Sequence, residues 1–161
     1  MDRSIYEEDT FAVIPQIEKG HAIWSIPYGI EGARNLGNAS DYANNFAHVD
    51  KRMRVDRTLW CHINIDGHDI GWVDFQAIPN QAAEQSGEYH VTTNDTSHSV
   101  WSKPYGVKNA SWIDSAVAYK NKKLESKMSI YMGKTRWLAF DNGRGGVFWL
   151  DSDVVSEGKV N

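Results

Sequence analysis

The chain contains an internal duplication, and this feature limits its possible folds more than any other. Residues 23–30 read IWSIPYGI, and residues 100–107 read VWSKPYGV, 77 positions later. The same offset continues without a gap and pairs further identical residues, among them Ala33 with Ala110, Tyr42 with Tyr119, Trp60 with Trp137 and Trp72 with Trp149. A repeat of this length is too long for most solenoids, so we expect two complete small domains in tandem.

The boundary between the two domains is predicted from composition. Residues 80–86 read NQAAEQS, a polar stretch without large apolar side chains, which is typical of a linker. We therefore divide the chain into residues 1–80 and residues 81–161, each long enough for a small domain.

No apolar stretch approaches 18 residues, so a membrane-spanning helix is not expected.

Each repeat has the pattern of an antiparallel β-hairpin. Residues 58–65 alternate imperfectly between apolar and polar side chains and end at Asp66-Gly67, a strong signal for a two-residue turn, after which residues 68–75 return. The second repeat has strand-like segments at 136–141 and 147–150, but its Asn142-Gly143 turn comes one residue earlier. We expect a β-bulge to absorb this shift.

The fold class that follows is all-β, with short strands forming two small barrels. Only residues 41–46 and 116–124 are compatible with short helices. Seven Trp and seven Tyr in 161 residues support this class, because large side chains must fill the limited core of a small β domain.

Three separated motifs, in order, resemble the GW module. They are Trp24-Ser25-Ile26-Pro27-Tyr28-Gly29, then Thr58-Leu59-Trp60, and finally Gly71-Trp72-Val73. The resemblance covers nearly the whole chain twice and implies tandem Src-homology-3-like β-barrels. Such modules occur in cell-wall hydrolases and surface proteins of Firmicutes, which they hold non-covalently on the envelope. The resemblance implies lipoteichoic acid or related wall polymers as ligands, and some members of the family also bind host-cell glycosaminoglycans.

Two features depart from the family pattern. The Gly of the signature dipeptide is replaced by Phe148 in the second repeat, so the two modules should differ wherever that Gly allows a close approach to the backbone. Family members that bind teichoic acid are usually basic, whereas this chain has a net charge of -4.

The charge is divided unequally between the repeats. Residues 22–79 contain five Lys or Arg against seven Asp or Glu, whereas residues 99–156 contain nine against five. The cations of the second repeat that form our candidate polyanion site are Lys120, Lys122, Lys123, Lys127, Lys134 and Arg136. A polyanionic ligand should therefore prefer the second repeat, although an ordinary solvated face is the alternative interpretation of these residues.

Aromatic residues supply a second set of candidates. The Trp60/Trp137 and Trp72/Trp149 pairs lie at strand positions, so we expect them in the core. Each repeat also carries a Trp and a Tyr beside the Pro-Tyr-Gly turn, and these can form a shallow platform for a sugar or peptide: Trp24, Tyr28, Trp101 and Tyr105. Trp112 has no aromatic counterpart, and contact with a ligand and packing between modules both remain open for it.

Catalytic and metal-binding residues are not indicated. The sequence has no nucleophile elbow, zinc-protease motif or phosphate-binding loop. The single cysteine, Cys61, corresponds to Leu138 in the other repeat, which favours a packing role over a nucleophile. One hairpin gathers potential metal ligands, namely His62, Asp66, His68 and Asp69, but the second repeat lacks them and we expect a solvated tip.

These observations predict a non-catalytic fragment, without cofactor or metal, that anchors a hydrolase or surface protein to the Gram-positive envelope from outside the cell. The predicted ligand is lipoteichoic or wall teichoic acid. One alternative is recognition of peptidoglycan peptide or glycan by the aromatic edges, and another is a structural anchor in a surface-layer or adhesin protein. The acidic total argues against nucleic acid, no membrane span is expected, and the fragment should be monomeric.

Overall fold

The protein consists of two β units, which a computed structural model describes over residues 4–158. The units part between Gln81 and Ala82. The first contains β1 (Tyr6–Val13), β2 (Ala22–Trp24), β3 (Asn35–Asn38), β4 (Phe46–Val55), β5 (Thr58–Ile65), β6 (His68–Asp74) and β7 (Asn80–Gln81). The second contains β8 (Ala83–Val91), β9 (Ser99–Trp101), β10 (Trp112–Ser115), β11 (Leu124–Met132), β12 (Thr135–Asp141), β13 (Val147–Asp151) and β14 (Val155–Glu157).

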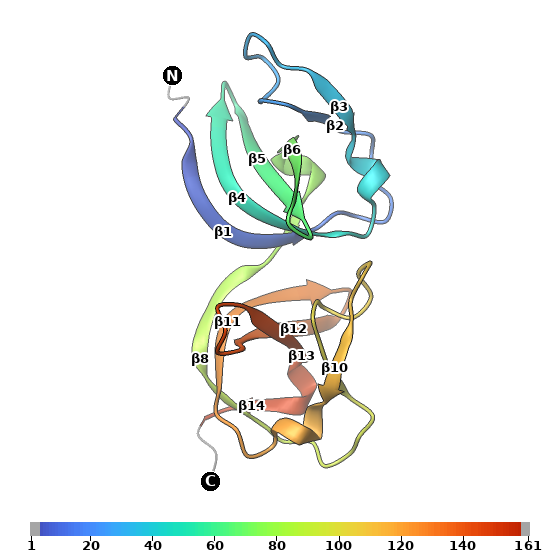
Figure 1. The fold of residues 1–161 in the computed structure, drawn as a ribbon, viewed down its shortest axis with the longest axis vertical. Coiled ribbons are helices and arrows are strands. Elements are labelled where there is room, and N and C mark those ends of the chain that lie inside the picture. Colours follow the sequence, from blue (N-terminus) through green and yellow to red (C-terminus); the bar gives the residue numbers. More distant parts are fainter. Residues whose placement is uncertain (1–3, 159–161) are drawn as a thin grey trace. The chain divides into compact units, whose positions relative to one another are not determined.

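Both units have the same sheet topology. The strand order is β3-β2-β6-β5-β4-β1-β7 in the first and β10-β9-β13-β12-β11-β8-β14 in the second, with antiparallel pairing between neighbours. Each sheet bends round on itself, most strongly along β1 and β4 and along β8 and β11 (Figure 1). The predicted all-β class with two tandem small domains is therefore confirmed.

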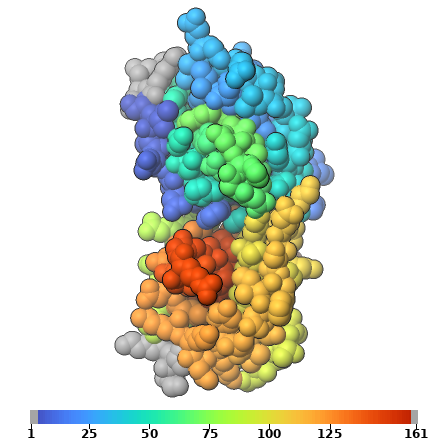
Figure 2. All heavy atoms as spheres, viewed as in Figure 1, coloured from blue at the N-terminus to red at the C-terminus, as the bar shows by residue number. Residues whose placement is uncertain are grey.

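A core of aliphatic and aromatic side chains fills each curved sheet. In the first unit it contains Ile14, Ile23 and Ile63, and in the second Leu138 and Phe140, each no more than 1% exposed. The expected burial of Trp60, Trp137, Trp72 and Trp149 is confirmed, since all four are at most 7% exposed. These buried side chains occupy the centres that the ribbons leave open, and Figure 2 shows the outer surface of side chains that covers each unit.

The polar segment 80–86 lies in strands and does not form an irregular linker. Asn80 and Gln81 form β7, which pairs with Val13 and Ala12 of β1 and takes the place that β14 has in the second unit. The first residues of β8 follow after Ala82. Ladder hydrogen bonds use the backbone, so the polarity of these side chains did not reveal the strand.

A β-bulge was expected in the hairpin of the second unit, but it lies in the hairpin of the first. The β5–β6 hairpin has the predicted two-residue turn, since Ile65 pairs with His68, but it contains a bulge because Ile63 pairs with Gly71 and Asn64 with Asp69. The β12–β13 ladder is regular up to the pair Asp141–Val147. The loop of residues 142–146 absorbs the shift there, so the bulge expected in the second repeat is wrong.

Short 3-10 helices complete each unit. η1 (Ala39–Tyr42) and η3 (Ala116–Tyr119) precede β4 and β11, while η2 (Phe75–Ala77) and η4 (Ser152–Val154) follow β6 and β13. The sequence was compatible with short helices at 41–46 and 116–124, but the last residue of each segment, Phe46 or Leu124, belongs to a strand. Within residues 4–158, no helix is long and apolar enough to cross a membrane.

Candidate functional site

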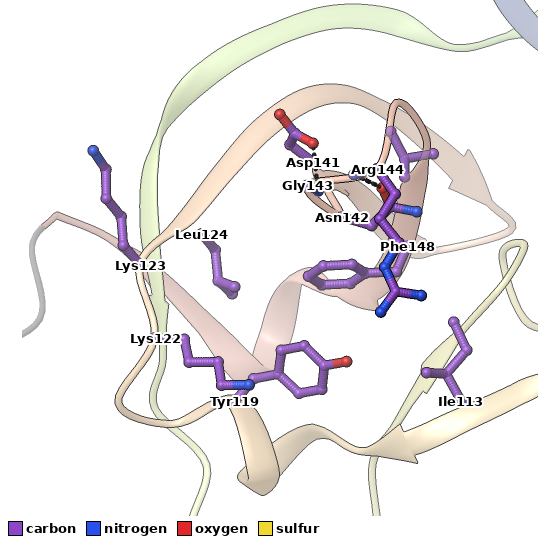
Figure 3. A pocket seen from close by; sticks show the side chains of 11 residues that line it. Ile113, Tyr119, Lys122, Lys123, Leu124, Asp141, Asn142, Gly143, Arg144 and Phe148 are labelled. Carbon is purple, nitrogen blue, oxygen red and sulfur yellow. Dashed lines mark hydrogen bonds between the residues drawn. The ribbon is translucent and has the colours of Figure 1, made fainter.

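A basic hollow lies in the second unit. It is an open cavity of about 690 Å³, formed where the loop after η3 faces the β12–β13 loop and the edge strand β10 (Figure 3). Its lining consists of Ile113, Tyr119, Lys122, Lys123, Leu124, Asp141, Asn142, Gly143, Arg144, Val147 and Phe148. Three cations thus lie around an aromatic and aliphatic floor.

Phe148 forms the floor of this cavity. Its side chain is 6% exposed, and its ring centroid lies 5.1 Å from that of Tyr119 and 5.9 Å from that of Phe140. The regular β12–β13 ladder pairs Phe148 with Phe140. The Phe that replaces the signature Gly therefore joins the core to the cavity, which gives the site a rigid apolar base.

The loop of residues 142–146 forms one wall through its own hydrogen bonds. Asn142 Oδ1 accepts from the backbone N–H groups of Arg144 at 2.8 Å and of Gly146 at 3.1 Å. Asp141 Oδ1 accepts from the Gly143 backbone N–H at 2.8 Å. Both polar side chains thus order the loop, and the Arg144 guanidinium is left on the cavity side beside Phe148 (Figure 3).

The three cations of the cavity are not equivalent. Lys122 Nζ lies 4.9 Å from the centroid of the Tyr119 ring, a cation–π contact that holds the charge over the floor. Lys123 Nζ instead lies 3.2 Å from Glu125 Oε1 and 3.5 Å from Glu88 Oε1. The hydrogen bond to Glu125 is the main cause that raises the pKa of Lys123. Lys123 therefore already has acidic partners, whereas Lys122 and Arg144 are the cations directed at the cavity.

The other predicted cations do not gather at this cavity. Lys120 ends η3, where its backbone N–H donates to Val117 O. Lys127 lies exposed on β11 and Lys134 in the β11–β12 turn. Arg136 Nη2 donates to Gln85 Oε1 across the sheet. The six residues predicted as one basic patch thus occupy several places on the second unit.

Sequence reasoning missed Arg144 and the role of Phe148. Arg144 lies in the loop whose early Asn142-Gly143 turn predicted only a β-bulge. Its neighbours in the cavity come from segments near residues 113, 119–124 and 148, and the sequence contains no local signal that brings these segments together.

The corresponding positions of the first unit are neutral. Phe46 takes the place of Lys123, is 5% exposed and stacks on Phe11 at 4.9 Å between ring centroids. Asn45 takes the place of Lys122 and is 7% exposed, and its Nδ2 donates to Tyr42 O at 3.0 Å. Gly67 replaces Arg144. The first unit therefore does not repeat this basic cavity.

The predicted aromatic platform has the same geometry in both units. Trp24 and Tyr28 have ring centroids 4.9 Å apart at 47°, and Trp101 and Tyr105 have the same values. Each Tyr is 61% exposed and sits in a turn that Gly29 or Gly106 completes with positive φ. Each pair thus offers one exposed ring fixed against a partly buried Trp.

Trp112 lies on the edge strand β10. Its side chain is exposed, and its Nε1 donates to Ser99 Oγ at 3.0 Å. The indole is therefore held against the neighbouring strand β9 of its own unit, and it does not line the basic cavity.

Cys61 is fully buried, and its Sγ lies 3.1 Å from Arg52 Nη1, which donates to it. Burial is the main cause that raises the pKa of the Cys61 thiol to about 11, so the thiol is protonated at neutral pH. A nucleophilic role requires an accessible thiolate, which this environment disfavours.

The hairpin expected to be a solvated tip is only partly so. Asp66, His68 and Asp69 are exposed, but His62 is 6% exposed. His62 Nδ1 lies 2.6 Å from Asp50 Oδ1, and its Nε2 lies 2.9 Å from Asp69 Oδ1. Within the described residues no group of three potential ligands is arranged to hold a metal ion. His62 instead links three strands.

Comparison with known proteins gives two matching domains and two relatives. A profile of the GW (Gly-Tryp) dipeptide domain matches residues 7–79 and residues 83–156. Protein Ami of Listeria monocytogenes serotype 1/2a (strain EGD / Mackaness) is 27% identical over 59 residues, which are 37% of this chain and 6% of that protein. A crystal structure of a Listeria monocytogenes protein described as an autolysin covers 96% of this chain at 19% identity and a TM-score of 0.46, and 64% of that other chain is covered.

Proposed function

Since the chain belongs to the GW (Gly-Tryp) dipeptide domain family in both of its units, we propose that it is a non-catalytic fragment that binds the cell wall. The motifs that indicated this family are thereby confirmed as its markers. The fragment would hold a larger protein on the outer envelope of a Gram-positive bacterium. Its match to a small part of the much longer Protein Ami supports the role of an attachment segment.

The ligand that the geometry supports best is an anionic wall polymer such as lipoteichoic or wall teichoic acid. The observation that carries this proposal is the cavity of the second unit, which Lys122, beside Tyr119, and Arg144, beside Phe148, line together. A guanidinium presents a planar fork of donors to phosphate oxygens, and a nearby ammonium adds a point charge. The aromatic floor suits the apolar edge of a glycerol, ribitol or sugar unit.

The net charge of -4 does not oppose this function, because the field at the cavity is local. The cations of the second unit act over about one Debye length, roughly 8 Å at physiological ionic strength. Much of the acidic excess lies instead in the first unit and in residues 80–98. Binding should accordingly weaken as salt is added, because phosphate contacts release counterions.

The test is a pull-down of the chain on purified Gram-positive walls at low and high salt, before and after removal of teichoic acid. The cavity variant Lys122→Ala/Arg144→Ala should weaken binding about tenfold or more, since charge-assisted hydrogen bonds contribute about 1.5–3 kcal/mol each. The control variant Lys127→Ala/Lys134→Ala removes the same charge from exposed positions outside the cavity and should change binding less than about twofold.

Two results would contradict this assignment. Equal losses in the two variants would mean that diffuse charge, rather than the cavity, attracts the wall. Binding that survives both salt and removal of teichoic acid would move the ligand to peptidoglycan.

The second result would favour the repeated aromatic pairs as the binding site. The specific observation in their favour is the same 4.9 Å and 47° arrangement in both units, with Tyr28 and Tyr105 exposed. Two equal weak sites on one chain raise the overall affinity through effective concentration. The variant Tyr28→Ala/Tyr105→Ala should then abolish the salt-resistant binding, whereas the variant of the basic cavity should retain it.

A further inference from the structure

The first unit has a hollow of its own at a different corner of the fold. It has a volume of about 330 Å³ and lies between the β4–β5 turn and η2. The side chains that line it are Arg54, Arg57, Thr58, Leu59, Asp74, Phe75 and Gln76. Two guanidinium groups thus share a hollow in the unit whose total charge is acidic.

The hairpin geometry explains why these two arginines lie together. Val55 pairs with Thr58, so the turn consists of Asp56 and Arg57 alone. Asp56 has a φ of 56°, which suits the tight turn that closes such a hairpin. Arg54 is the last residue before the closing pair, and the turn therefore sets Arg54 and Arg57 on one rim.

Both arginines are available to a ligand. Within residues 4–158 neither side chain forms an ion pair or a hydrogen bond, and both are exposed. Arg52, two residues earlier on β4, is different: it is 7% exposed and is bound to Glu8, Cys61 and Gln81. Of these three arginines, Arg52 is therefore buried and structural, whereas Arg54 and Arg57 are exposed.

The acidic residue in this hollow, Asp74, caps the short helix η2. Asp74 Oδ1 accepts from the Gln76 backbone N–H at 2.9 Å and caps η2. Asp151 makes the same bond to Asp153 in the second unit, where Tyr131 takes the place of Arg54. The carboxylate therefore belongs to the turn of both units, and the pair of arginines is particular to the first.

We propose that the hollow of Arg54 and Arg57 is a second oxyanion site, which binds one phosphate or sulfate ester group. Arginine forks match the tetrahedral oxygens of such groups, and the Thr58 hydroxyl can donate a further hydrogen bond. Phe75, 39% exposed, adds an apolar wall for the carbon skeleton beside the ester. As a site for the wall polymer it rests on the proposed function, but as an oxyanion site it is independent of the cavity in the second unit.

The test follows the arginine Nε–Hε signals of the whole chain by NMR during titration with inorganic phosphate and with sulfate. A chain carrying Lys122→Ala/Arg144→Ala is titrated in parallel, so that the two sites are separated. Arg54→Ala/Arg57→Ala should weaken the response of the Phe75 and Gln76 amides about tenfold. The control Arg34→Ala/Lys51→Ala removes equal charge from exposed positions of the same unit that do not line this hollow, and it should leave that response unchanged.

Saturating shifts at Arg54 and Arg57 that persist in the variant of the second unit would support the proposal. Their absence, or equal effects of the two first-unit variants, would overturn it even if wall binding is otherwise intact. Oligomers of glycerol phosphate and of a sulfated glycan then distinguish the two sources of the ester. Saturation by either through Arg54 and Arg57 supports the site and identifies its natural ligand class, and saturation by neither overturns it.

Discussion

The two units use the same number of residues differently at the tip of one hairpin. In the first, residues 64–70 give long strands, a bulge and a two-residue turn, and the chain returns at Gly71. In the second, residues 141–147 give a regular ladder, a five-residue loop and a return at Phe148. The first arrangement requires Gly, and the second allows a large ring and a loop that carries Arg144 over it. A common topology thus supports the cavity of Lys122 and Arg144 in the second unit but not at the corresponding place in the first.

Among the differences between the two units, substitution of Gly71 should cause the largest loss of stability. It has a φ of +134°, and an added Cβ would lie 2.8 Å from Ile23 Cγ2 and 2.9 Å from the carbonyl oxygen of Trp24. Gly71→Ala should lower the free energy of unfolding of the first unit by about 3 kcal/mol, from overpacking together with an unfavourable φ. Urea titration followed through the indole NMR signals of Trp60 and Trp137 reports the two units separately.

A second glycine separates the two causes. Gly67 also has positive φ, at +81°, but an added Cβ there would have no atom within 4 Å. Gly67→Ala should therefore cost only about 1 kcal/mol, the conformational part alone. If Gly67→Ala and Gly71→Ala destabilise the first unit equally, the close approach of β2 to β6 is not the reason for the signature Gly.

Arg52 supplies the next largest expected difference between the units. Its guanidinium links its own strand, β4, to three others. Nε donates to Glu8 Oε2 on β1, Nη1 to Cys61 Sγ on β5 and Nη2 to Gln81 Oε1 on β7. Arg52→Ala should lower the free energy of unfolding of the first unit by about 2 kcal/mol, because the half-buried Glu8 and Gln81 and the buried Cys61 lose their donor. Thermal unfolding of the variant chain measures this loss.

The matched control is the counterpart of Arg52 in the second unit, Ser129. Ser129→Ala should cost that unit about 0.5 kcal/mol or less. Arg52→Met keeps the aliphatic stem and removes only the donors. Stability restored by Met would show that packing of the stem, rather than the hydrogen bonds to Glu8 and Gln81, is what matters.

How far the sequence predicts the molecule depends on how local the cause is. The strand 58–65 and its turn were predicted correctly because alternation and Asp-Gly act within a few residues. The strand character of residues 80–86 was missed because it arises from pairing with β1 and β11, far away in the chain. The cavity is less predictable still. The positions of the lysines in the sequence do not distinguish Lys122, which lines the cavity, from Lys127, which is exposed on β11.

The smallest expected difference between the units is in how their stability depends on pH. Burial acts to raise the pKa of Asp50, but hydrogen bonds from His62 and Asn64 outweigh it and hold the pKa below its ordinary value. A carboxyl whose pKa is lowered by folding adds stability above its ordinary pKa, and this stability is lost as the pH falls through the lowered value. The second unit has Lys127 and Ala139 in place of Asp50 and His62, so it lacks this contribution.

Asp50→Asn should therefore destabilise the first unit at pH 7, and the difference from the unaltered chain should shrink as the pH falls below about 4, where an ordinary Asp is protonated. Unfolding followed through Trp60 and Trp137 at pH 7, 5 and 3 measures this in both units at once. A difference that stays constant from pH 7 to pH 3 would show that Asp50 acts through packing rather than through its charge.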